Sequence, residues 1–250
     1  MTKIFISYAR SDGEKLAEFL HKRLTGCGYD VWKDSHDLEV GRNFPGGISD
    51  ALETANDFII LVSPAALRSE WVNNEVNMAM AARSRILPIV FDVVNNDDIP
   101  LMLRTKNYVL MKGTEDWQAL IRIVDSLEGG KNIPRVYNLS GHADIMVRDL
   151  LVLGHSPFEK ADLPTPDSVV EKARKLAQEA WPYLKSGAGI VPPGHPALAT
   201  AVLAYLLGTE NQMPRLYYTY RVEEKFGISG DRFVDLQGLR DEGFEYRSRI

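Results

Sequence analysis

Cysteine and long hydrophobic runs are almost absent from this chain of 250 residues. Cys27 is the one cysteine, so no disulfide framework can form within the chain. No apolar run approaches the roughly 20 residues that a membrane-spanning helix needs. Residues 1–6 lead directly into an apolar strand and lack the pattern of a signal peptide. We therefore expect a cytoplasmic protein that does not associate with membranes.

An excess of positive charge is also missing. The chain carries 34 acidic and 29 basic residues, which gives a net charge of −5 at pH 7. DNA binding depends on neutralising phosphates, so this balance argues against direct DNA binding while leaving room for a local basic pocket. The sequence contains no heptad array or short-period repeat, and we expect no bound metal.

The first half of the chain alternates between strand-like and helix-like patterns. Apolar runs predict strands at residues 3–8, 29–32, 57–63, 86–91 and 107–111. Helical periodicity predicts helices at residues 12–25, 48–55, 64–82 and 115–127. Strands separated by helices in this order predict a parallel sheet with helices on both faces.

Residues 128–134 contain two glycines and a proline close to the end of a periodic helix, which marks a domain boundary. We expect one domain at residues 1–130 and a second at residues 131–250. The second domain has predicted strands at 135–139, 190–191, 216–220 and 233–236, and helices at 166–185 and 196–207. Residues 147–153 fit either a helix or a strand, and Pro182 should bend or shorten its helix. This pattern predicts a smaller Rossmann-like α/β domain.

Glu75 is the strongest candidate for a catalytic residue. Trp71 precedes it by four residues, so the two share one face of the predicted helix. An acid one turn from a large aromatic suits a cleft that holds a flat, polar ligand. The pair alone is weak evidence, because most glutamates on amphipathic helices are simply solvated.

The order of motifs before Glu75 strengthens this interpretation. Residues 5–12 (FISYARSD), 28–34 (GYDVWKD), 37–41 (DLEVG), 61–63 (LVS) and 69–75 (SEWVNNE) follow one another at consistent spacing. In this order they resemble the TIR domain family over residues 3–127. The resemblance implies a flavodoxin-like parallel sheet for the first domain.

Members of the TIR family divide into enzymes and scaffolds. The enzymes cleave the nicotinamide–ribose bond of NAD, with a glutamate at the position that Glu75 occupies here. The resemblance implies substrate contacts from Ser7, Tyr8, Arg10, Asp34, Leu38 and Trp71. Other interpretations remain for three of them: Arg10 as a surface arginine, Asp34 as an acid that caps a loop, and Trp71 as a core residue.

NAD is expected as a substrate and not as a cofactor, because no glycine-rich dinucleotide fingerprint follows the first strand. The long segment at residues 35–47 has a second expected role. In this family the corresponding loop often contacts a neighbouring copy, and we expect it to complete the NAD site on assembly.

Two short turns carry the ligand prediction for the second domain. Asn138, Ser140, Gly141 and His142 follow one predicted strand, and Pro193, Gly194 and His195 follow another and precede a helix. A strand, a small polar turn and a helix N-terminus suit an anion. The alternative is that the glycine and prolines only form a turn and the histidines lie on the surface.

Residues 135–245 resemble the small Rossmann-like sensors of CRISPR-associated CARF-type proteins. A sensor for a different cyclic nucleotide, such as a SAVED-like or STING-like domain, is an alternative, although the segment is short for the first and shows no pattern of the second. The resemblance implies a homodimer that binds a cyclic oligoadenylate, with tetra-adenylate favoured, and that forms a higher oligomer or filament. The whole chain is then an antiviral effector whose NAD cleavage is switched on by this ligand. Two alternatives are a scaffold without catalysis and a TIR enzyme whose product is a cyclic ADP-ribose signal. A third interpretation, degradation of the activator by His142 or His195, has no supporting pattern.

Overall fold

The computed structural model describes residues 2–33, 54–91, 93–142, 145–159, 163–209, 213–222 and 225–248. Contacts within the chain gather into two compact units, Met1–Asn132 and Ile133–Ile250. The division falls inside the segment rich in glycine and proline at residues 128–134. None of the described helices is long and apolar enough to cross a membrane.

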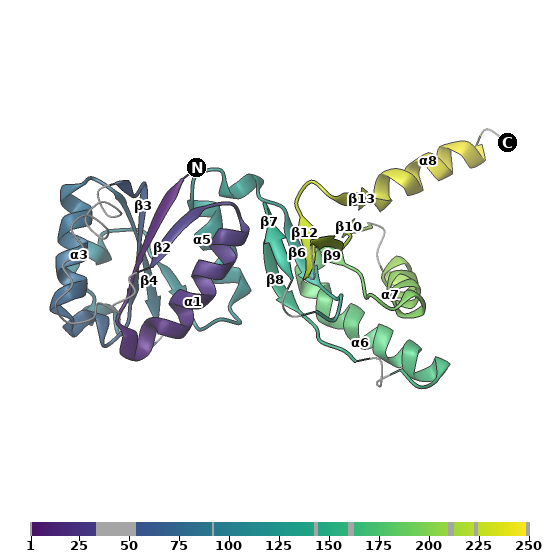
Figure 1. Cartoon of the computed structure of the whole chain (residues 1–250), viewed down its shortest axis with the longest axis horizontal. Helices are drawn as coiled ribbons and strands as arrows, with labels where there is room; N and C mark the ends of the chain where they lie inside the picture. Colours follow the sequence, from purple (N-terminus) through teal and green to yellow (C-terminus); the bar gives the residue numbers. More distant parts are fainter. Residues whose placement is uncertain are drawn as a thin grey trace. The chain divides into compact units, whose positions relative to one another are not determined.

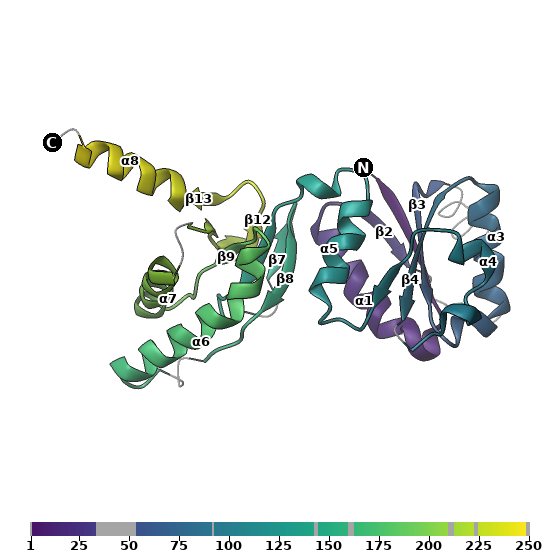
Figure 2. The ribbon, with the colours of Figure 1, turned by 180° about the vertical axis from the view of Figure 1, so that it is seen from behind.

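The first unit is built on a five-stranded parallel sheet with the order β2-β1-β3-β4-β5. The strands are β1 (Lys3–Ser7), β2 (Asp30–Lys33), β3 (Asp57–Val62), β4 (Arg85–Phe91) and β5 (Val109–Met111). The helices are α1 (Arg10–Gly26), α3 (Glu70–Ala81), α4 (Leu101–Arg104) and α5 (Trp117–Ser126), with single 3₁₀ turns η1 (Ala66–Arg68), η2 (Asn96–Asp98) and η3 (Gly130–Asn132). Helices α1 and α5 cover one face of the sheet, and α3 and α4 cover the other (Figures 1 and 2). The predicted parallel α/β fold is confirmed.

The burial of β3 shows why this arrangement forms. All six of its residues are buried, as expected for a central parallel strand with a helix on each face. Phe58, Ile60 and Val62 pack in one cluster with Val72 and Val76 of α3. Alternate residues of a strand point to opposite faces, so Ile59 and Leu61 fill the face covered by α1 and α5.

The predicted helix at residues 64–82 is wrong as a single element. The chain forms η1, and then Ser69 adopts an extended conformation before α3 begins. The Ser69 hydroxyl accepts a hydrogen bond from the Val72 amide at 3.3 Å and so caps the helix N-terminus. Serine competes for backbone groups in this way, and a helix that starts after it is favoured over a continuous one. The predicted helix at 48–55 lies almost entirely outside the described residues.

The second unit contains a five-stranded and a three-stranded sheet, with the orders β13-β10-β9-β6-β8 and β11-β12-β7. Its strands are β6 (Arg135–Asn138), β7 (Met146–Arg148), β8 (Leu151–His155), β9 (Gly189–Val191), β10 (Arg215–Tyr217), β11 (Tyr220–Val222), β12 (Lys225–Ser229) and β13 (Phe233–Asp235). Its helices are α6 (Pro166–Lys185), α7 (Pro196–Thr209) and α8 (Leu236–Ser248). Strands β10, β9, β6 and β8 are parallel, and only the edge strand β13 is antiparallel. The predicted smaller Rossmann-like domain is confirmed as a fold class.

Two apolar clusters lie on opposite faces of the larger sheet. Tyr137, Leu139 and Ile190 pack against α6 and α7. Val136 and Val152 pack on the other face, with residues of the smaller sheet such as Ile228. The sheet is therefore the middle layer of three, as Figure 1 shows.

Several predictions for the second unit need correction. Residues 147–153 form parts of two strands, because Asp149, with φ of 54°, turns the chain between β7 and β8. The predicted strand at 216–220 is divided between β10 and β11, which belong to different sheets. Pro182 lies inside α6 and does not shorten it, since the helix continues to Lys185. Strand β12 and helix α8 were not predicted.

Candidate functional site

A buried pair of polar residues marks the carboxyl edge of the first sheet. Ser7 is the last residue of β1, and Glu75 lies in the second turn of α3. The Ser7 hydroxyl donates a hydrogen bond to Oε2 of Glu75 at 2.5 Å. The exposed fractions of the two residues are 0% and 2%. Residues 68 positions apart in the sequence thus meet where open α/β sheets bind their ligands.

The local sequence explains why Glu75 points inward. Val72, Val76 and Ala79 form the face of α3 that packs on the sheet. Glu75 is three residues after Val72 and so shares this inward face. Glutamate is rarely buried, because removing a carboxylate from water is unfavourable unless hydrogen bonds replace the water. The contact with Ser7 supplies one such bond, and the burial distinguishes Glu75 from a solvated glutamate.

A second polar cluster joins α1 to the segment that leads into α3. Asp12 accepts a hydrogen bond from the Ser63 hydroxyl at 2.6 Å and another from the Ala65 amide at 2.9 Å. The Ser63 hydroxyl in turn accepts from the Ala66 amide at 3.1 Å. The sequence interpretation gave Asp12 and Ser63 no role. A serine directly after a buried strand, at the edge where ligands bind, is the signal that points to this cluster.

The other predicted substrate contacts have different outcomes. Tyr8 directly follows β1 and is buried, and Arg10 is exposed as the first residue of α1. Both therefore lie at the same edge as Ser7. The backbone of Trp71 is in the first turn of α3, but its side chain is outside the description. Asp34, Leu38 and the predicted assembly loop at 35–47 lie outside the described residues.

In the second unit, the two predicted turns lie side by side at the carboxyl edge of the larger sheet. The Leu139 amide donates to the Val191 carbonyl at 2.9 Å, which joins the ends of β6 and β9. A Cβ placed on Gly194 would lie 3.7 Å from the Ser140 carbonyl oxygen. The structure therefore brings together two segments more than 50 residues apart that the sequence interpretation had grouped by their chemistry.

Several polar groups of the first turn, residues 138–142, form hydrogen bonds within the turn itself. The Asn138 side chain donates to the His142 carbonyl at 2.8 Å and accepts from the Ser140 amide at 2.9 Å. The His142 amide donates to the Ser140 hydroxyl at 3.3 Å. Gly141 has φ of +86°, and an added Cβ would lie 2.8 Å from the ring of Phe158. Asn138 and Ser140 thus shape the turn.

The two histidines of these turns are placed differently. The His142 ring stacks on Phe226, with 4.6 Å between ring centroids. His195 accepts a hydrogen bond at Nδ1 from the Leu198 amide at 3.3 Å, so it covers the start of α7. Pro193 is buried beside it. One face of the His142 ring stacks on Phe226, whereas His195 caps the N-terminus of α7.

A buried serine that the sequence interpretation missed lies next to these turns. The Ser156 amide donates to the Asn138 carbonyl at 3.0 Å. Its hydroxyl donates to the Glu179 carboxylate at 2.5 Å and lies 2.9 Å from the Tyr137 hydroxyl. Ser156 directly follows β8, so its position after a predicted strand was the available signal. Among the described residues, no cluster of histidine, cysteine and carboxylate side chains is arranged to hold a metal ion.

Comparison with known proteins agrees with the geometry of the first unit. The family model of the TIR domain matches residues 4–124. Residues 4–124 form a TIR domain. The predicted TIR domain is therefore confirmed for these residues.

Several curated relatives carry enzyme names. The chain is 29% identical over 147 residues to the protein named NAD(+) hydrolase sarm1 of Drosophila melanogaster. That alignment covers 53% of this chain and 11% of the fly protein. It is 31% identical over 98 residues to 2' cyclic ADP-D-ribose synthase BtTIR of Bacteroides thetaiotaomicron. That alignment covers 37% of this chain and 34% of the bacterial protein. The chain therefore spans about a third or less of the length of these relatives.

A solved TIR domain is also similar to this chain. The TIR domain of the Toll-related receptor TRR-2 from Hydra magnipapillata aligns with a TM-score of 0.40 and 22% identity. The alignment covers 50% of this chain and 100% of that domain.

Proposed function

We propose that the TIR domain cleaves the nicotinamide–ribose bond of NAD and that Glu75 is the catalytic residue. One observation carries the proposal: a glutamate carboxylate is buried at the carboxyl edge of a parallel sheet and is oriented by the Ser7 hydroxyl. The names of the NAD-cleaving relatives of this TIR domain give independent support. Neither a loop glutamate nor a solvated one would be held in this way.

The chemistry of the bond suits a single carboxylate. When the C–N bond breaks, its electron pair moves onto the nicotinamide nitrogen, and the positively charged ring becomes neutral. Positive charge develops on the ribose, which becomes oxocarbenium-like. A carboxylate stabilises this charge or holds the ribose hydroxyls, and no strong acid is needed for the neutral leaving group. Water then adds to the ribose carbon and loses a proton, which gives ADP-ribose.

Neighbouring residues have supporting roles in this proposal. Ser7 is a positioning residue, since its hydroxyl fixes one oxygen of Glu75. Arg10 is exposed at the same edge, where its guanidinium suits a phosphate of NAD. Because Glu75 is 2% exposed, the side chains around it must rearrange before ribose can reach the carboxylate. We infer from this burial that the domain is active only in a rearranged state.

The test is NAD loss and nicotinamide release by purified protein, measured by chromatography. Glu75→Gln should lower the rate at least about 100-fold, because it removes the charge and keeps the shape. Glu70→Gln is the matched control: it lies on the same helix, but its side chain is exposed, and it should retain the rate. Equal rates for the wild type and Glu75→Gln would refute the catalytic role.

The product separates hydrolysis from signalling. If water attacks, the product is linear ADP-ribose. If a hydroxyl of the same molecule attacks, the product is a cyclic ADP-ribose that is one water lighter. Mass spectrometry of the wild-type product decides between the two, and the relative named as a cyclic ADP-ribose synthase is the reason to make the measurement.

For the second unit we propose regulation by a cyclic oligoadenylate, with tetra-adenylate favoured. The support is the contact between the turns at 138–142 and 192–195, which places backbone groups, a histidine ring and the N-terminus of α7 at one edge. A homodimer with two such edges suits a ligand with two-fold symmetry. Ligand-driven assembly into a higher oligomer or filament then activates the TIR sites, and loss of NAD stops the infected cell.

This regulation is tested with cyclic tri-, tetra- and hexa-adenylate in the same NAD assay. Activity that requires one of the three ligands and that is lost in His142→Ala supports the sensor. Activity without any ligand refutes the regulation and leaves the enzyme in place. No activity under any condition, with normal self-association, favours a TIR scaffold.

A further inference from the structure

A separate cavity lies at the amino ends of the strands of the larger sheet, opposite the carboxyl ends that carry the two turns. Its volume is about 430 Å³, and all of the described residues that line it belong to the second unit. Arg135 is at the start of β6, Gly189 at the start of β9 and Arg215 at the start of β10, so the cavity is at the amino ends of these strands. The turns at 138–142 and 192–195 follow the carboxyl ends of β6 and β9. The cavity is therefore distinct from that edge.

The charged residues that line the cavity are all basic. Arg135, Lys185 and Arg215 line the cavity, and none of its described lining residues is acidic. The whole chain has a net charge of −5, so three cations without a carboxylate are a local departure from its composition. Arg135 is half-buried, with Nε inaccessible to solvent, whereas Lys185 and Arg215 are exposed. A lining of this kind favours an anion, and guanidinium groups favour phosphate in particular.

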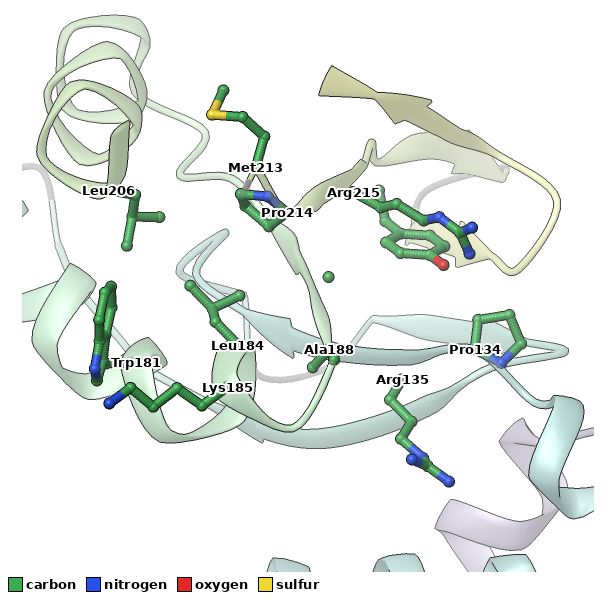
Figure 3. Close-up of a pocket in the computed structure, with 13 residues that line it drawn as sticks. Pro134, Arg135, Trp181, Leu184, Lys185, Ala188, Leu206, Met213, Pro214 and Arg215 are labelled. Atoms are coloured by element: carbon green, nitrogen blue, oxygen red, sulfur yellow. The ribbon is translucent and has the colours of Figure 1, made fainter. Parts of the chain in front are cut away.

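The rest of the lining is apolar or aromatic. Trp181 and Leu206 lie on the side away from Arg135 and Arg215, as Figure 3 shows. The Lys185 ammonium lies 5.4 Å from the centre of the Trp181 ring and keeps the cation beside the indole. The Tyr217 phenol is buried, and burial raises its pKa while the neighbouring Arg215 opposes the rise. One side of the cavity thus carries Trp181, Leu206 and the Lys185 ammonium, and the other carries Arg135, Arg215 and the Tyr217 phenol.

We propose that this cavity binds a phosphorylated ligand of mononucleotide size, with the phosphate between Arg135 and Arg215 and the base against Trp181. The volume is within the range of small-molecule sites, roughly 300–1,000 Å³. A free phosphate would leave the apolar side empty, and an uncharged aromatic ligand would not use the cations. The combination of the two sides selects a nucleotide. Neither the catalytic proposal nor the regulatory proposal above depends on this site.

The test uses the full chain and titrates AMP, GMP, CMP and UMP separately by calorimetry. At least one should bind saturably below about 1 mM, and more tightly than its nucleoside or ribose 5-phosphate. Arg215→Glu should weaken binding by about tenfold or more, since it replaces a charge-assisted contact by a repulsive one. Trp181→Leu should remove the preference for the nucleotide over ribose 5-phosphate.

Controls separate this site from the rest of the molecule. Arg174→Glu makes the same charge change at an exposed position of α6 outside the lining, and it should leave binding unchanged. Circular dichroism spectra and melting curves that match the wild type show that Arg215→Glu is folded. The proposal is overturned if none of the four nucleotides binds. It is also overturned if folded Arg215→Glu binds as tightly as the wild type, which would place the ligand elsewhere, including at the TIR domain.

Discussion

Removal of the Ser7 hydroxyl is the perturbation that most directly tests the candidate site. In Ser7→Ala, Glu75 remains buried but loses a hydrogen bond of 2.5 Å. A hydrogen bond to a charged group contributes about 1.5–3 kcal/mol, and a buried acceptor that loses its donor is destabilising. We therefore expect the free energy of unfolding of the first unit to fall by about 2 kcal/mol. Ser7 is 0% exposed, so water cannot replace the hydroxyl without local rearrangement.

A double-mutant cycle isolates this contact from other effects of the substitution. Glu75→Leu keeps a similar volume and removes the acceptor, so Ser7→Ala in that background should change stability by less than about 0.5 kcal/mol. The expected coupling between the two positions is then about 1.5 kcal/mol or more. Equal effects of Ser7→Ala in both backgrounds would refute the argument, because they would mean that the hydroxyl does not support the carboxylate.

The assay is urea unfolding followed by tryptophan fluorescence. Trp32, Trp71 and Trp117 are in the first unit, and Trp181 alone is in the second, so the signal reports mainly on the unit that contains the contact. Equal slopes of the unfolding free energy against urea for the four proteins would show that the compared states are the same. The NAD assay on Ser7→Ala then adds a functional readout, because a positioning role predicts a lower kcat with little change in KM.

Three further predictions concern stability. Burial raises the pKa of Tyr29 from 10.0 to about 12, so between these pH values the unfolded chain loses the phenolic proton while the folded chain keeps it. The free energy of unfolding should therefore fall as pH rises through this window. Tyr29→Phe should reduce this fall by at most about 2 kcal/mol after solvent screening. Urea unfolding at pH 9 to about 12 measures the difference. Gly130→Ala places a Cβ 1.7 Å from the Val124 carbonyl oxygen and should cost about 1–3 kcal/mol; an unchanged melting temperature would contradict this. Gly208→Ala meets no atom within 4 Å in α7 and should stabilise the chain by about 0.4–1 kcal/mol, so a lower melting temperature would show that the position is constrained.

The helices and strands with strong periodicity were predictable. Residues 58–62 are a continuous apolar run and lie in β3, and α6 begins and ends at the predicted residues, 166 and 185. Errors occurred where local chemistry competes with periodicity. Ser69 interrupts a helical pattern because its hydroxyl caps a new helix, and Asp149 adopts a positive φ that apolar patterning cannot indicate. Short strands such as β12 depend on pairing partners far away in the sequence.

The candidate site was predictable in part. Glu75 was recognised from its motif context, and Ser7 was named with it, but their contact requires β1 and α3 to meet. Asp12 and Ser63 were missed because neither belongs to a recognisable local motif for a site, and their significance comes from the hydrogen bond between them. Asp34 and Leu38 stay predictions. The assignment of the second unit to cyclic oligoadenylate binding also stays a prediction, since its motifs are short.

The sequence by itself determined the α/β class, the order of the strands and helices along the chain, and the TIR pattern around Glu75, because these depend on local periodicity and on motif order. Tertiary structure alone decided which polar side chains meet. It buried Glu75 against Ser7, joined the turns of β6 and β9, and gathered Arg135, Lys185 and Arg215 around one cavity. Such contacts join residues between 30 and 80 positions apart, and only the packing of the sheets brings them within reach.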